Sequence, residues 1–146
     1  MFGKILVPVD GSPHSKRAVE VAVGLAKRLE ASVYLLHVIR NLSLPIEIME
    51  MIAAGEITES RMEILQNSAQ IILDNARRSF EAAGLTEIAA DYVIGDPASK
   101  ILEYAEKNGL DLIVIGHRGL GPHSGLLGGV SRNLLNMTTI SCLVVA

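Results

Sequence analysis

The chain has 146 residues, of which 49% are apolar and 3% aromatic, and its formal net charge is −3. This acidic balance with few stacking rings excludes a nucleic-acid-binding surface, and the single cysteine, Cys142, excludes an internal disulfide and a zinc cluster of cysteines. No stretch approaches the roughly 20 consecutive apolar residues of a membrane span. Because Met1 to Asp10 also lack the features of a secretion signal, we expect a cytoplasmic protein without membrane association.

Five continuous apolar runs, each bounded by turn residues, are typical of strands that are buried on both faces of a parallel sheet. In chain order they are Ile5 to Val9, Val33 to Ile39, Ile88 to Ile94, Leu110 to Ile115 and Ile140 to Ala146.

Helical patterns separate these runs, and their ends carry recognisable start and stop residues. Ser12 followed by Pro13 opens a helix that extends to Glu30. A second helix is predicted from Thr58 to Ala83, a third opens at Asp96 and Pro97 and ends by Gly109, and a fourth extends from near Gly128 to about Met137.

This alternation predicts one α/β domain over residues 1–146, with an open five-stranded parallel sheet, doubly wound, and helices on both faces. In such sheets ligands bind beyond the carboxyl ends of the strands, here near Asp10, Val38 and Gly116. The segment from Asn41 to Thr58 interrupts the pattern. It is either a flap or short extra helix over this site or a variable surface excursion, and the second interpretation is favoured.

Residues 116–131 read GHRGLGPHSGLLGGVS, with six glycines directly after the fourth apolar run. Gly116 and Gly119 would let the backbone bend, while Gly128 and Gly129 would bring backbone amides to the start of the last helix, where an anion is stabilised. The alternative is that the glycines serve only a sharp turn. The loop is not a Walker A motif, because no GKS or GKT follows.

Several motifs together resemble the universal stress protein family, in that family's order and spacing along essentially the whole chain. They are ILVPVDGS, LLHVI, GDPASKILEYAEKNGLDLIVIGHRG, LLGGVSRNLL and CLVVA. The resemblance implies an adenine nucleotide alpha-hydrolase-like fold with the flavodoxin-like strand order 3-2-1-4-5, and ATP or AMP as the ligand. It also implies a homodimer formed by the last strand, Ile140 to Ala146.

The loop departs from the pattern of family members that bind ATP, which is GxxG, nine residues, Gly-Ser or Gly-Thr, then Val and Ser or Thr. With Val130 and Ser131 matched to that pattern, eight residues separate Gly119 from Gly128, and Gly129 replaces the hydroxyl residue. Losing one neutral hydroxyl contact weakens phosphate binding by about 1 kcal/mol, or up to about tenfold. Arg118 would supply a compensating charge-assisted contact.

The resemblance implies roles for residues on other strands as well. Asp10 would face the adenosine, whereas from the residues alone it is an ordinary turn former. Pro8, Val9 and Val38 would border the base and the ribose, and the alternative is that they are strand core. The implied nucleotide contacts are Pro8, Val9, Asp10, Val38, Ile115, Gly116, Arg118, Gly119, Gly128, Gly129, Val130 and Ser131.

Metal and catalytic sites find little support in the sequence. His117 and His123 lie in the glycine loop with no acidic residue between them, so we expect solvated loop residues and not a metal pair. His37 is expected to be a hydrogen-bonded strand histidine. No set of nucleophile, base and orienting residue stands out, so slow ATP hydrolysis is the most that is expected. Asp10 is the carboxylate that would hold a Mg²⁺ ion through water.

The resemblance therefore implies a nucleotide-responsive stress regulator with a regulatory protein partner. One alternative is a nucleotide-free family member that acts through protein contacts, and another is a slow ATPase. A flavodoxin-like electron carrier is disfavoured by the few aromatic residues. The apolar last strand would lie at a sheet edge, where a second copy would cover its unpaired amides.

Overall fold

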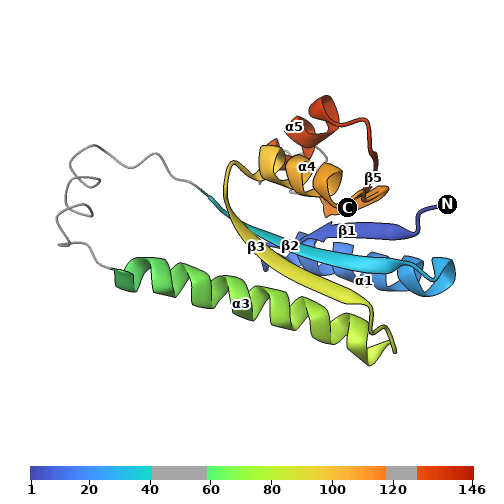
Figure 1. Ribbon diagram of the computed structural model, residues 1–146, viewed down its shortest axis with the longest axis horizontal. Helices are drawn as coiled ribbons and strands as arrows, with labels where there is room; N and C mark the ends of the chain where they lie inside the picture. The colour runs from blue at the N-terminus through green and yellow to red at the C-terminus, as the bar shows by residue number, and fades with distance from the viewer. Residues whose placement is uncertain (41–58, 118–127) are drawn as a thin grey trace.

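The computed structural model describes residues 1–40, 59–117 and 128–146, with the exception of the side chains of residues 59–61. Five strands in these ranges form one parallel sheet in the order β3-β2-β1-β4-β5 (Figure 1). Their bounds are β1 Lys4–Pro8, β2 Ser32–Arg40, β3 Ile88–Gly95, β4 Leu112–Gly116 and β5 Ser141–Val145. The predicted parallel sheet and its order 3-2-1-4-5 are confirmed.

The helices of the described ranges cover both faces of this sheet. Their bounds are α1 Pro13–Leu29, α3 Glu59–Ala82, α4 Pro97–Lys107 and α5 Gly129–Met137. Helices α1 and α3 lie on one side of the sheet and α4 and α5 on the other (Figure 1). The doubly wound arrangement that the sequence predicts is therefore present.

Two hydrophobic clusters, one on each face, account for the continuous apolar runs. Consecutive side chains of a strand point to opposite faces. In β1, Leu6 packs in the cluster under α4 and α5, and Val7 packs in the cluster under α1 and α3. Both side chains are fully buried. A strand that is buried on both faces cannot alternate with polar residues.

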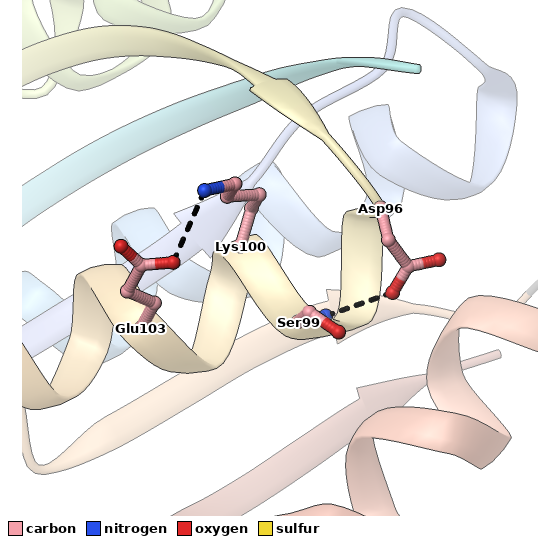
Figure 2. A network of polar contacts seen from close by, with 4 residues as sticks. All are labelled: Asp96, Ser99, Lys100 and Glu103. Carbon is pink, nitrogen blue, oxygen red and sulfur yellow. Dashed lines mark hydrogen bonds and ion pairs between the residues drawn. The ribbon is translucent and has the colours of Figure 1, made fainter. Parts of the chain in front are cut away.

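Side-chain caps explain why two helices begin where the sequence predicts. The Ser12 hydroxyl accepts a hydrogen bond from the Ser15 amide at 3.2 Å, and the Asp96 carboxylate accepts one from the Ser99 amide at 3.1 Å. Figure 2 shows the second cap at the start of α4. The Ser99 amide holds the pKa of the Asp96 carboxyl below its ordinary value.

Asp111 joins the amino ends of β1 and β4, and it lies outside β4, which begins later than the sequence predicted. The Asp111 carboxylate accepts hydrogen bonds from the amides of Gly3 and Lys4, each at 3.1 Å. Asp111 thus caps the amino end of β1. Strand β4 begins at Leu112, whereas the apolar run predicted a start at Leu110. The apolar run alone does not distinguish the last turn residues from the first strand residues.

The fifth strand, β5, forms one edge of the sheet, as expected. Its residue Leu143 is 38% exposed. Within the ranges that the structure describes, no helix is long and apolar enough to cross a membrane. The segment from Asn41 to Thr58 lies outside the described residues, so its interpretation as a flap, a short extra helix or a surface excursion stays a prediction.

Candidate functional site

The winding of the sheet reverses between β1 and β4, which are hydrogen-bonded neighbours at its centre. Ligands of open α/β sheets bind at such a reversal, beyond the carboxyl ends of the strands. At this edge β1 leads into Asp10 and β4 ends at Gly116. The first turns of α1 and α5 begin beside the same edge. Of the predicted site residues that the structure describes, Asp10, Gly116 and Ser131 therefore lie in one region, at the carboxyl ends of β1 and β4.

Gly116 lies directly against the first turn of α1. A Cβ atom at this position would stand 2.6 Å from both the carbonyl carbon and the oxygen of His14, and 3.0 Å from the amide nitrogen of Ser15. The imidazole rings of His14 and His117 meet edge to face, with ring centroids 6.4 Å apart. Close backbone approach is thus a sufficient reason for a glycine at the end of β4.

Asp10 forms the turn between β1 and α1. Its backbone amide donates to the Ser15 hydroxyl at 3.1 Å, and its Oδ1 accepts from the Ser12 amide at 2.9 Å. The turn-forming interpretation is therefore confirmed, and contact with a ligand stays a prediction. The residue is exposed at the carboxyl edge of the sheet, where a bound molecule can reach it.

Val9 is 4% exposed, and both of its backbone polar groups are already paired. Its amide donates to the Leu36 carbonyl at 2.8 Å, and its carbonyl lies 2.7 Å from Nδ1 of His37. The expected hydrogen bond of the strand histidine is confirmed. In this arrangement the Val9 amide is not available to a ligand, while its carbonyl keeps one further lone pair.

The other strand residues of the predicted site are largely part of the core. Pro8 is buried and pairs with Leu36 in the register of β1 and β2. Ile115 is buried and Val38 half-buried, both in the cluster under α4 and α5. The strand-core interpretation of these residues is confirmed, while their contact with a base or ribose stays a prediction.

The amino end of α5 differs from those of α1 and α4, because its cap residue is Gly128 and has no side chain to accept a hydrogen bond. The Arg132 amide donates to the Gly128 carbonyl at 3.0 Å, which is the first bond of the helix. The amides of Gly129, Val130 and Ser131 therefore precede the intrahelical ladder. They form the positive end of the helix dipole.

Ser131 connects the start of α5 to the end of β4. Its hydroxyl donates to the Gly116 carbonyl at 3.1 Å, and the residue is 2% exposed. This bond holds the start of α5 against the end of β4. Because a hydroxyl has one proton to donate, Ser131 in this arrangement offers an anion its backbone amide and not its hydroxyl hydrogen.

Gly129 has open surroundings. The residue is exposed, and beyond its chain neighbours and its own helix a Cβ atom there would meet no atom of the described residues within 4 Å. The hydroxyl side chain that is absent at this position would therefore fit without a clash. Gly129 is the first residue of α5, so this helix begins at an exposed residue, and helix amino ends stabilise anions.

Two predicted contacts, Arg118 and Gly119, lie outside the described residues, as does His123. The bend of the loop, the compensating contact of Arg118 and the fate of the histidine pair therefore stay predictions. Among the residues that are described, no group of three or more His, Cys, Asp or Glu is arranged to hold a metal ion.

The sequence patterns predicted neither that His14 lies against Gly116 and His117 nor that His37 pairs with the Val9 carbonyl. The position of His14 in the first turn after β1 is a signal that could have drawn attention to it. The contact of His37 had no such signal, because it joins residues 28 positions apart.

Comparison with known proteins agrees with this arrangement. The protein-family model described as "Universal stress protein family" matches residues 1–146 of the chain. Universal stress protein YxiE of Bacillus subtilis is 35% identical over 149 residues, which cover 99% of this chain and 99% of YxiE.

Solved structures share the fold. The structure of protein MJ0577 of Methanocaldococcus jannaschii matches with a TM-score of 0.80 and 27% identity, covering 99% of this chain and 96% of that one. A universal stress protein in complex with cAMP matches with a TM-score of 0.69 and 28% identity, covering 98% and 95%. With its full-length match, its relatives and its sheet order, the chain belongs to the universal stress protein family.

Proposed function

We propose that this chain binds an adenine nucleotide, ATP or AMP, at the carboxyl ends of β1 and β4 and acts as a nucleotide-responsive stress regulator. The observation that carries the proposal is the amino end of α5, where three amides precede the first helical bond beside Gly116. The similar protein whose structure contains cAMP supports an adenine nucleotide as the ligand.

In this proposal the phosphates lie against α5. The amides of Gly129, Val130 and Ser131 donate to phosphate oxygens, and the helix dipole adds about 0.3–1 kcal/mol at an exposed site. The Gly128 cap has no side chain that would compete for these amides. The loop residues Arg118 and Gly119 complete the contacts to the phosphates.

The adenosine lies toward β1 and β2. The Asp10 carboxylate accepts a hydrogen bond from a ribose hydroxyl, and Pro8, Val9, Val38 and Ile115 provide the apolar boundary. A Mg²⁺ ion that accompanies ATP would be held by Asp10 through water, because Mg²⁺ keeps several waters and needs few protein carboxylates.

Calorimetric titration with ATP and AMP tests the proposal, in protein freed of any copurified nucleotide. We expect saturable binding of both, and no binding at millimolar nucleotide would overturn the proposal. Asp10→Asn keeps an oxygen for the turn but removes the charge, and it should weaken binding. Glu106→Gln, an exposed carboxylate on α4, is the matched control and should bind as the wild type does.

A second candidate is a family member that acts through protein contacts alone. Gly129, which lacks the hydroxyl, and the exposed edge strand β5 favour it. The same titration separates the two candidates.

In either case we propose a cytoplasmic, single-domain protein that forms a homodimer through Ile140 to Ala146. Turnover of bound ATP, measured in a single-turnover assay with Mg²⁺, would favour a slow ATPase instead.

A further inference from the structure

The carbonyl of Val9 lies where the pairing of β1 and β2 ends. The last residue of β1 in register is Pro8, opposite Leu36, and the Val9 amide makes one further bond to the Leu36 carbonyl. Within the described part of the chain, no backbone amide donates to the Val9 carbonyl. A buried carbonyl without a donor is strongly disfavoured. The imidazole of His37, at 2.7 Å, takes the place of that donor.

The chemistry of this contact determines the state of the ring. A carbonyl oxygen can only accept, so Nδ1 of His37 must carry the hydrogen. The neutral ring is then the Nδ1–H tautomer. The protonated ring also carries a hydrogen on Nδ1, so this contact persists in both charge states.

The Val9 carbonyl and the Asp10 amide belong to the same peptide unit, and that unit is held at both ends. On the β2 side, His37 donates to the carbonyl at 2.7 Å. On the α1 side, the Asp10 amide donates to the Ser15 hydroxyl at 3.1 Å. Because a peptide unit is planar, two opposed hydrogen bonds fix its orientation. The orientation of this unit sets the direction in which the Asp10 side chain leaves the backbone.

We propose that His37 is a positioning residue for the nucleotide site, which acts through the Val9–Asp10 peptide and keeps the Asp10 carboxylate aimed at the ligand. The proposal rests on the proposed function, since it assigns a role in that same site. His37 itself needs no contact with the nucleotide. Ser15 is its counterpart at the other end of the peptide.

Two substitutions of His37 distinguish the effect of its hydrogen-bond donor from the effect of its side-chain volume. His37→Asn places an amide nitrogen at the position of Nδ1 and keeps the hydrogen bond. His37→Leu keeps comparable bulk and removes the donor. We expect His37→Leu to weaken ATP and AMP binding by about tenfold, and His37→Asn to stay within about threefold of the wild type.

The counterpart and a control complete the series. Ser15→Ala should weaken binding as His37→Leu does, and the double variant should bind no worse than about the weaker single one, because both act on one peptide. Ser32→Ala is the matched control. It removes a hydroxyl bonded to Glu87 at the opposite edge of the sheet and should leave affinity unchanged.

A spectroscopic readout separates positioning from a general loss of stability. Nitrogen-detected spectra of the wild-type imidazole should show the Nδ1–H tautomer for His37. The amide resonance of Asp10 should shift in His37→Leu and return toward its wild-type position in His37→Asn. These measurements do not depend on nucleotide, and the first does not depend on any variant being folded.

Each failure has a distinct signature. Wild-type protein that binds nucleotide, together with a folded His37→Leu variant of unchanged affinity, would overturn the positioning role and leave the proposed function standing. Equal losses in His37→Asn and His37→Leu would overturn the donor role, as would an Nε2–H tautomer in the wild type. Wild-type protein that binds no ATP or AMP would overturn both proposals.

Discussion

Two glycines at the candidate site occupy very different surroundings. Gly116 lies against the backbone of His14, where a Cβ atom would come within 2.6 Å of two atoms. At Gly129 a Cβ atom would find open space among the described residues. The first glycine is required for packing in this structure, whereas the second is a position where a side chain can be added. Only the second is therefore a position where the proposed choice between nucleotides can be tested by adding a side chain.

Replacing Gly116 with alanine should destabilise the protein and disturb the site. The methyl group would push β4 away from the first turn of α1, and such overpacking typically costs about 1–3 kcal/mol. Urea denaturation measures the loss. Gly129→Ala is the matched control, because its methyl group would contact no other part of the chain that the structure describes. It should be neutral or stabilising by up to about 1 kcal/mol. Equal stability of the two variants would show that β4 does not lie this close to α1.

Restoring a hydroxyl with Gly129→Ser should tighten ATP more than AMP. The added group stands at the first turn of α5, on the phosphate side of the proposed site, and one neutral hydrogen bond contributes about 1 kcal/mol, or up to about tenfold in affinity. Paired calorimetric titrations of wild type and variant measure the ratio. If both nucleotides gain equally, the position does not sense the distal phosphates.

At the scale of elements, the start of α5 differs from the starts of α1 and α4. The side chains of Ser12 and Asp96 accept hydrogen bonds at the starts of α1 and α4, and both are followed by proline. At the start of α5, Gly128 offers none. A side-chain cap stabilises a helix by itself, while an uncapped end leaves its amides to other partners.

The Asp96 cap gives α4 a pH-dependent contribution to stability. The pKa of this carboxyl is lowered, chiefly by the Ser99 amide, so its contribution is fully present above the unfolded-state pKa of about 3.9. It is lost as the pH falls through the lower, folded-state pKa. Asp96→Ala should therefore lower the Tm at pH 7, and the difference from wild type should narrow below about pH 4. Circular dichroism melts across this range measure it, and a constant difference would contradict the assignment.

Local signals in the sequence were sufficient for the elements but not for the contacts between them. The apolar runs and the pairs Ser12-Pro13 and Asp96-Pro97 predicted strands, helices and their order, because burial on both faces and capping are written into neighbouring residues. The bond from Ser131 to Gly116 spans 15 positions and that from His37 to Val9 spans 28. Such contacts form only when the chain has folded, so no pattern among neighbouring residues predicts them.

At the scale of the whole molecule, the two sheet edges are β3 and β5. An edge strand presents unpaired amides and carbonyls that can pair with another chain. β5 combines this edge with the exposed side chain of Leu143, while Cys142 beside it is half-buried. Burial raises the pKa of the Cys142 thiol, so little reactive thiolate is present near neutral pH.

If β5 pairs with its twin in a second copy, a charge on this strand should separate the dimer. Leu143→Lys places an ammonium at the shared edge, where it would face its own copy across the two-fold axis, and like charges so placed oppose pairing. We expect a dimer for the wild type and a monomer for the variant in sedimentation velocity. Ile71→Lys, on α3 and 61% exposed in the wild type, is the matched control and should remain dimeric.

The thiol provides an independent measure of the same event. Pairing through β5 would cover Cys142, so its alkylation should be slow in the wild type and in Ile71→Lys and faster in Leu143→Lys. Monomeric wild-type protein, or a dimer that survives Leu143→Lys with unchanged alkylation, would place the contact between copies elsewhere. The nucleotide titrations repeated on the monomeric variant then show whether occupancy of the site and the state of this edge are linked, as a nucleotide-responsive regulator requires.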